Sequence, residues 1–203
     1  MDETVTVRGN LGIRELLIGP PRPAAYPTTS QLATQLGIAE PHWRSLLEAE
    51  DIVCAEAPDK SIAGVQITNH YGFLSDAERV RELRAAMNVL CNRFKLSPSS
   101  IAFGSQSLIV SEFETTDLRH HLLRSLLRTV GFRYRHLFSV CPINNPLELN
   151  TLQSQGWRCF QEEDDRCYLM LDVAKALRGL ASQLVLRIPP RAQRVAARAS
   201  GTL

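Results

Sequence analysis

Long apolar stretches are absent from this sequence. No run approaches the roughly 18 consecutive apolar residues that a membrane-spanning helix needs. Residues 1–4 are partly acidic and precede no apolar segment, so we expect no secretory signal. Hydrophobic residues make up 44% and charged residues 22% of the 203 residues, which is ordinary for a globular protein that buries a core. We therefore expect a cytoplasmic protein without a membrane span.

Metal-binding cysteine motifs are absent as well. The sequence has an odd number of cysteines, five, and no Cys-x-x-Cys pair, so the spacing of metal ligands is missing. The five are Cys54, Cys91, Cys141, Cys159 and Cys167. We interpret them as reduced thiols that mostly fill the core, and we expect no metal.

Acidic residues are missing from the segment 174–203. This segment carries six basic residues, which leaves 17 basic against 21 acidic residues on 1–173, a net charge of about −4. A basic tail can contact nucleic acid or an acidic partner protein. This one has no aromatic residue to stack on bases. We expect a solubilising extension with one amphipathic helix near residues 173–186, and a nucleic-acid role is not expected.

Hydrophobic periodicity and breaker residues divide the rest of the chain. The expected order is a strand at about 3–17, helices at 28–37 and 41–50, a hairpin of 51–56 and 62–68, a helix at 75–94, a strand at 107–113, a helix at 118–130, a strand at 135–140, another helix, and a hairpin of 158–161 and 167–171. Antiparallel hairpins combined with one β-α-β crossover predict an α+β (mixed α/β) class. We expect one domain at 1–173, made of an N-terminal part (1–50) and a core (51–173), followed by a basic C-terminal extension at 174–203.

The most informative passage runs from Ser107 to Trp157, because it contains a complete strand–helix–strand–helix order. A strand that feeds a polar turn opening a helix directs several backbone N–H groups at one point, which is a phosphate-binding geometry. The turn here, Glu114 to Asp117, has none of the glycines that let a backbone approach a phosphate closely.

This passage resembles the GNAT superfamily, the general-control-related N-acetyltransferases, and the order of elements extends the resemblance over residues 51–173. The resemblance implies a central mixed, mostly antiparallel sheet flanked by helices. It also implies a strand that binds the pantetheine arm of acyl-CoA, an Asn at the end of the next strand, and Gly156-Trp157 after the following helix. The implied cofactor-binding residues are Leu108, Ile109, Val110, Thr115, Thr116, Asp117, Leu118, Arg119 and Asn145.

The pyrophosphate motif departs from the family pattern at each hallmark position. Glu114 stands where the family has Arg or Gln, and Asp117 and Arg119 stand at the two glycine positions. One interpretation is that the turn only supplies an N-cap, Thr116 or Asp117, to the helix that follows. The other is that backbone N–H groups at the helix start hold phosphate, helped by Arg119 and Arg124.

The pattern offers several residues that could move protons. Acyl transfer to an amine needs a base, and the candidates are His70 and Tyr71 after the first hairpin, Glu112 on the pantetheine strand, and His120. In many family members a Tyr protonates the departing thiolate, and it lies four residues before the position of Gly156 in this chain. This chain has Leu152 there. Cys141, at a strand end beside the implied site, is interpreted as a packing residue.

The resemblance thus implies an acyltransferase that moves an acyl group from a thioester to an amine of an unknown small-molecule or peptide acceptor. The donor is acyl-CoA or an acyl carrier protein thioester. A carrier protein presents a single phosphodiester, which relaxes the need for a glycine-lined loop. The alternative is a catalytically inactive GNAT-like binding or regulatory module. A carrier protein and a second copy of the chain stay open as partners.

Overall fold

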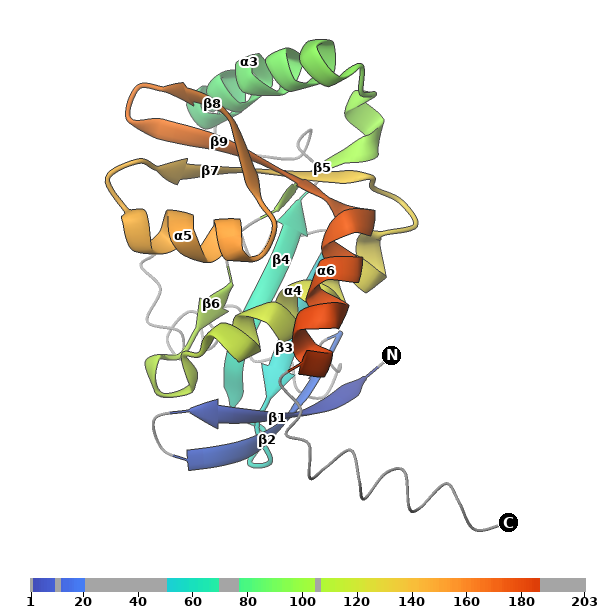
Figure 1. Cartoon of the computed structure of the whole chain (residues 1–203), viewed down its shortest axis with the longest axis vertical. Helices are drawn as coiled ribbons and strands as arrows, with labels where there is room; N and C mark the ends of the chain where they lie inside the picture. Colours follow the sequence, from blue (N-terminus) through green and yellow to red (C-terminus); the bar gives the residue numbers. More distant parts are fainter. Residues whose placement is uncertain (1, 10–11, 21–50, 70–76, 105–106, 187–203) are drawn as a thin grey trace.

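The computed structural model describes residues 2–9, 12–20, 51–69, 77–104 and 107–186 (Figure 1). The strands are β1 (Glu3–Gly9), β2 (Gly12–Gly19), β3 (Asp51–Glu56), β4 (Ile62–Asn69), β5 (Ile101–Gly104), β6 (Leu108–Ile109), β7 (His136–Pro142), β8 (Arg158–Glu163) and β9 (Arg166–Asp172). The helices are α3 (Ala77–Phe94), α4 (Thr116–Val130), α5 (Pro146–Ser154) and α6 (Val173–Leu186), with short 3-10 turns at Pro98–Ser100 and Ser111–Phe113. The helices expected at 28–37 and 41–50 lie outside the described residues.

The strands form one nine-stranded sheet in the order β1-β2-β3-β4-β5-β7-β9-β8, with β6 also paired to β4. All neighbours run antiparallel except β5 and β7, which are parallel. The helix between a parallel pair is the crossover that such a pair requires. The expected α+β class, with a mixed and mostly antiparallel sheet flanked by helices, is therefore confirmed.

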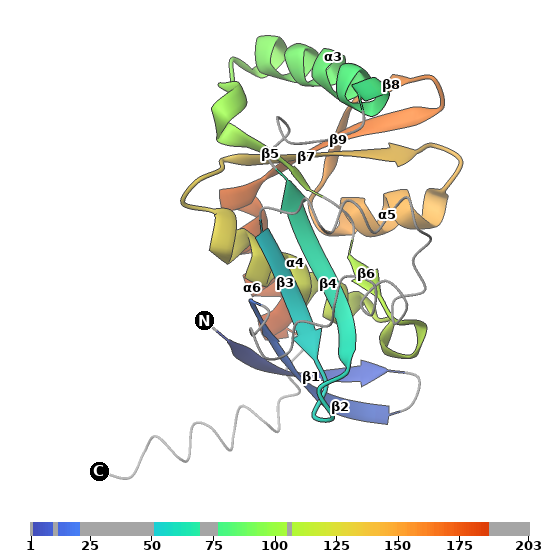
Figure 2. The ribbon, with the colours of Figure 1, turned by 180° about the vertical axis from the view of Figure 1, so that it is seen from behind.

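Alternating side chains give each face of the sheet its own core. On β7, Leu137 and Cys141 join the larger cluster beneath α4, α5 and α6, whereas Phe138 joins a smaller cluster beneath α3. This period of two is what a strand buried on both faces requires. α3 and the β1–β2 hairpin lie at opposite ends of the molecule in both views (Figures 1 and 2).

Two strand predictions are wrong. The stretch expected as one strand at 3–17 is a hairpin, in which Gly9 pairs with Gly12. The strand expected at 107–113 is paired only at Leu108–Ile109 and then enters a 3-10 turn. The strand that pairs with β7 is the preceding β5, Ile101–Gly104, which was not expected from the sequence.

The helix expected near 173–186 is confirmed as α6. Its residues Ala176 and Leu180 are buried in the main core cluster, and α6 contacts α4. The part of the expected C-terminal extension that lies in α6 therefore packs on the domain, while the division at residue 173 stays a prediction. No helix among the described residues is long and apolar enough to cross a membrane. The cytoplasmic location stays a prediction.

One cysteine pair contradicts the expectation of reduced thiols. Cys159 on β8 and Cys167 on β9 are joined as a disulfide, with their Cα atoms 6.0 Å apart. Cys54, Cys91 and Cys141 are unpaired, and the first and last of these are buried. The hairpin was expected, but the pairing was missed because a register shift between Cys159 and Gln161 on β8 decides which residues of the two strands meet.

Candidate active site

The sheet divides between β6 and β7. Residues Ile101–Phe103 of β5 pair in parallel with His136–Phe138 of β7. The chain then continues into β6, which pairs with Gly64 and Val65 of β4. Among the described residues no pairing joins β6 to β7. We call this divergence of Leu108–Ile109 from Ser139–Pro142 the strand fork.

The backbone of Ile109 faces the strand fork. The N–H of Val110 donates to the carbonyl of Ala63 on β4 at 2.9 Å. Because backbone groups alternate in direction along a strand, the N–H of Ile109 points to the opposite side, away from β4. One donor of the implied pantetheine strand is therefore directed between the two diverging strands, and Val110 is not that donor.

Close packing holds β6 against β4. A Cβ at Gly64 would lie 3.0 Å from Ile109 Cγ1 and 3.1 Å from the carbonyl oxygen of Leu108, closer than ordinary contacts. Next to this point, the hydroxyl of Ser107 donates to the side-chain oxygen of Gln66, and both residues are buried. The side of β6 that faces β4 is therefore fixed by shape and by a buried hydrogen bond.

The turn before α4 is built around a different cap from either one expected. Thr115 is the N-cap, and its side chain accepts from the N–H of Leu118 at 3.1 Å. The N–H of Arg119 donates to the carbonyl of Thr115. The prediction of Thr116 or Asp117 as the cap is therefore wrong, because α4 begins at Thr116, two residues before the expected start at 118. The N–H groups of Leu118 and Arg119, at the helix start where phosphate was expected to bind, are therefore engaged within the protein.

Arg119 is paired inside the protein. Its Nε donates to Glu114 Oε1 at 2.7 Å, a second guanidinium nitrogen binds the same oxygen, and Nη1 donates to the carbonyl of Ser107 at 3.1 Å. The carboxylate neutralises the cation where a pyrophosphate would need it. Arg124 lies elsewhere and pairs with Glu3 at 3.4 Å. The turn therefore carries little positive charge that is available to an anion.

Asn145 and Glu148 form a reciprocal cap at the start of α5. The Asn145 side chain accepts from the Glu148 N–H at 3.3 Å and donates to Glu148 Oε2 at 2.8 Å. Glu148 Oε1 is buried without a hydrogen-bond partner of ordinary geometry among the described residues. Burial raises the pKa of Glu148, opposed by the Cys141 thiol, Arg119 and Asn145. Glu148 is thus a half-buried carboxyl group that lies near both the strand end and the start of α4.

Cys141 is not an activated nucleophile. Burial, followed by the nearby Glu148 charge, raises the pKa of its thiol to about 12. A nucleophilic cysteine needs a lowered pKa, so the interpretation of Cys141 as a packing residue is supported.

Gly156 and Trp157 have a structural role behind the site. Gly156 has φ of +97°, which suits glycine, and ends the turn after α5. Trp157 is buried and its ring lies against Gly104, where β5 ends and the strand fork begins. Leu152 is also buried. On α5, Glu148 precedes Leu152 by four residues, so the two lie on one helix face.

The expected bases have different positions. His70 and Tyr71 lie outside the described residues. Glu112 is exposed in the 3-10 turn after β6 and is not on a strand, because the strand ends at Ile109. His120 is buried on α4 with neither ring nitrogen hydrogen-bonded among the described residues. The sequence did not single out Glu148, because the segment that contains it was expected only to form a helix. Its position three residues after Asn145, a capping-box spacing, was the available signal.

Comparisons with known proteins agree with this fold. No family model and no curated protein matches the chain. Several solved structures, however, are similar to it in fold. The GNAT domain of S. lividans PAT is similar with a TM-score of 0.52 at 10% identity, covering 83% of this chain and 96% of that one. A GNAT family acetyltransferase from Elizabethkingia anophelis, with acetyl-CoA bound, has a TM-score of 0.51 at 11% identity, covering 77% and 97%.

A third neighbour is a spermidine N-acetyltransferase SpeG chimera from Vibrio cholerae and hSSAT. Its TM-score is 0.51 at 12% identity, covering 80% of this chain and 98% of the other. The chain therefore has the GNAT fold. At these identities the likeness shows architecture, and the chemistry has to be argued from the residues of the site.

Proposed function

We propose that this chain is an N-acyltransferase that moves an acyl group from a thioester to an amine. The observation that carries the proposal is the strand fork. Diverging parallel strands leave backbone donors unpaired between them, and a pantetheine arm can pair with such an edge as an added strand. Ile109 supplies the outward-directed N–H there. That N–H is positioned for the thioester end of the donor.

The proposed reaction is direct transfer. The amine nitrogen attacks the thioester carbonyl, the C–N bond forms, and the C–S bond breaks. The Ile109 N–H stabilises the oxygen on which negative charge develops. Glu148 accepts the proton that the amine loses and passes it to the departing thiolate. Its raised pKa brings a carboxyl group nearer to the working pH, which favours both steps.

The donor is an acyl-CoA or an acyl carrier protein thioester, and the turn before α4 favours the carrier protein. Glu114 already binds the Arg119 guanidinium, and two helix-start amides are engaged by Thr115. A diphosphate with its adenosine would have to displace these contacts. The single phosphodiester of a carrier-protein arm asks for fewer anion contacts. The acceptor is a small-molecule or peptide amine.

A donor comparison tests the proposal. The full chain is incubated with a polyamine or a lysine-containing peptide and with acetyl-CoA, long-chain acyl-CoA, or matching acyl carrier protein thioesters, and the released thiol is measured. We expect transfer with at least one donor class, faster with the carrier protein. Absence of transfer from every donor would overturn the proposal.

A non-catalytic GNAT-like binding module is the second candidate. The Glu114–Arg119 pair and the apolar Leu152 in place of an acidic Tyr favour it. A thermal-shift screen separates the two: a ligand at 100 times its Kd stabilises the folded state by about 2.7 kcal/mol. Stabilisation by an acyl donor without turnover would support the module.

A further inference from the structure

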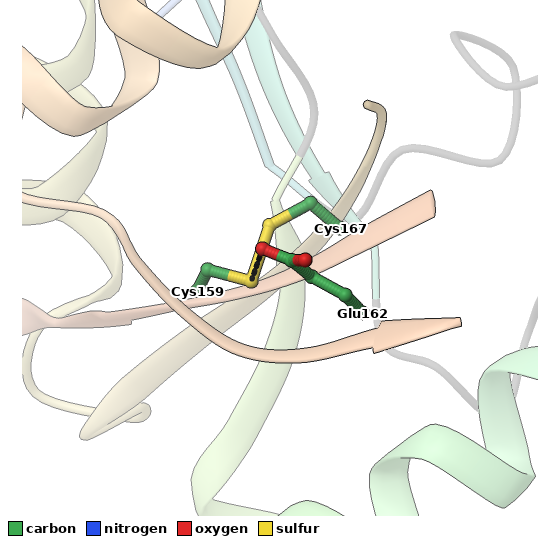
Figure 3. A group of neighbouring side chains, drawn as sticks. All are labelled: Cys159, Glu162 and Cys167. Carbon is green, nitrogen blue, oxygen red and sulfur yellow. Dashed lines mark hydrogen bonds between the residues drawn. A yellow bond between two sulfur atoms is a disulfide. The ribbon is translucent and has the colours of Figure 1, made fainter. Parts of the chain in front are cut away.

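Three potential metal ligands lie together on the β8–β9 hairpin, outside the strand fork. They are the sulfur atoms of Cys159 and Cys167 and a carboxylate oxygen of Glu162, all within 4.8 Å of one another (Figure 3). Glu162 Oε1 lies 3.9 Å from the Cys159 sulfur. Two sulfur ligands and one oxygen ligand are a donor set that Zn²⁺ accepts in proteins.

A β-bulge creates this group. Cys159 pairs with Leu169, Gln161 pairs with Tyr168 and Glu162 pairs with Cys167, so Phe160 is an extra residue on β8. In a regular strand, residues three apart point to opposite faces. The extra residue places Cys159 and Glu162 on the same face as Cys167. Without the bulge the three ligands could not meet.

Residues of α3 contact the bulge independently of the cysteines. Arg93 Nη1 donates to the carbonyl of Phe160 at 2.6 Å. The Phe160 ring packs edge-on against Phe94 and also contacts Phe138 and Tyr168 on the face opposite the cysteines. The ligand arrangement is therefore kept by contacts that do not depend on a bond between the sulfur atoms.

The group has a buried side and an exposed side. Cys167 is 1% exposed, Cys159 is half-buried and Glu162 is exposed, so an ion would enter past the Glu162 carboxylate. The turn continues with acidic residues through Asp165, which gives its surroundings a negative potential. Glu163 accepts from Gln161 Nε2 at 2.6 Å and lies on the other face.

We propose that, when both cysteines are reduced, Cys159, Glu162 and Cys167 bind one thiophilic divalent cation of the Zn²⁺ type, with water completing the coordination. Binding releases the two thiol protons for each cation bound. Reduction lets the sulfur atoms take the roughly 3.8 Å spacing of two thiolates on tetrahedral zinc. The disulfide and the metal site are two exclusive states of one cysteine pair. This differs from the sequence-based expectation of no metal, and it does not depend on acyl transfer.

Co²⁺ is the probe, because thiolate ligands give it an intense near-ultraviolet charge-transfer band. The full chain is reduced with a phosphine, which leaves two thiols and one phosphine oxide for each disulfide, and is then titrated with Co²⁺ and afterwards with Zn²⁺. We expect saturation at one equivalent, loss of the band when Zn²⁺ displaces Co²⁺, and no band from the oxidised protein. Absence of the band from the reduced protein would overturn the proposal.

Matched variants locate the ion. Cys159→Ser is expected to weaken binding at least about 100-fold, because loss of a direct ligand exceeds the 10–100-fold typical of outer-shell changes, while Cys91→Ser on α3 leaves binding unchanged. Glu162→Gln should weaken binding and Glu163→Gln should not. If Cys159→Ser does not fold, the Glu162→Gln and Glu163→Gln variants still test the proposal, because both side chains are exposed and their replacement should not disturb folding. Equal effects of both Glu variants would contradict the assignment.

Discussion

At the scale of single residues, Glu148 combines two roles that are usually separate. It completes the helix cap with Asn145, and its second oxygen is buried near Cys141. A carboxyl group in this setting is more readily protonated than one in water, because burial penalises the charged form. The proposed proton transfer depends on that shift, whereas the cap depends only on hydrogen bonding.

Replacing Glu148 by Gln separates the two roles. Gln retains a cap partner, so we expect the free energy of unfolding to change by less than about 1 kcal/mol. The rate of acyl transfer should fall about 100-fold or more, because general base catalysis contributes that much. In the unmodified protein, activity should rise with pH through the raised pKa of Glu148, and this limb of the pH profile should disappear in the variant.

Glu112→Gln is the matched comparison for this change, because Glu112 is an exposed carboxylate and one of the candidate bases from the sequence. We expect little effect on rate. A larger loss from Glu112→Gln than from Glu148→Gln would show that Glu148 is not the proton acceptor.

Releasing Arg119 tests the turn before α4. In Glu114→Gln the guanidinium loses its carboxylate partner and can contact phosphate. We expect the affinity for acetyl-CoA to rise about tenfold, measured by titration calorimetry. Arg119→Gln should not produce this gain. Unchanged affinity in Glu114→Gln would mean that the ion pair does not limit coenzyme A binding.

At the scale of elements, β6 is the piece on which the strand fork depends. It is two residues long and contacts β4 through the gap that Gly64 leaves. The 3-10 turn that follows leads into α4, so the position of β6 also sets where the helix begins.

Gly64→Ala should displace β6. The added Cβ would press on the Leu108 carbonyl and on Ile109, and overpacking of this kind costs about 1–3 kcal/mol. Denaturant unfolding measures the loss, and acyl transfer should fall with it. Gly179→Ala on α6 is the control. A Cβ there meets nothing within 4 Å, so the variant should gain about 0.5–1 kcal/mol from helix propensity.

At the scale of the whole molecule, one buried and two half-buried histidines make the stability of the domain depend on pH. Burial lowers the pKa of His120, His121 and His136 below the ordinary 6.5. A lowered folded-state pKa means that the neutral form is favoured in the folded protein. Stability is therefore complete above pH 6.5 and is lost as the pH falls through 6.5 toward the folded-state values.

We expect the thermal midpoint to fall between pH 7 and pH 5. Each buried histidine contributes a slope of up to about 1.4 kcal/mol per pH unit. Thermal unfolding followed by circular dichroism measures the slope, and His120→Leu should reduce it, because His120 is 2% exposed and has no partner for a charged ring among the described residues. An unchanged slope in this variant would assign the effect to other groups.

Features that depend on residues close together in the sequence could be predicted, whereas features that depend on distant residues could not. The β3–β4 and β8–β9 hairpins, α4 and α6 were predictable, because turn residues and apolar spacing act within a few residues. The shortness of the strand expected at 107–113 was not, because only Leu108 and Ile109 pair, and their partners on β4 lie much earlier in the chain. The cap at Thr115 lies one residue before Thr116 and two before Asp117, the caps expected from the sequence, because local patterns specify helix ends less sharply than helix interiors.

The sequence by itself determined the α+β class, most of the elements, and the absence of glycines from the turn before α4. Only the tertiary structure decided how the strands pair. It placed β6 beside β4 and away from β7, which creates the strand fork, and it placed Glu148 near Cys141 and Arg119. It also gathered Cys159, Glu162 and Cys167 through a bulge that no spacing rule reveals. The physical reason is that local patterns specify which side chains are buried, whereas long-range pairing and register specify which of them meet.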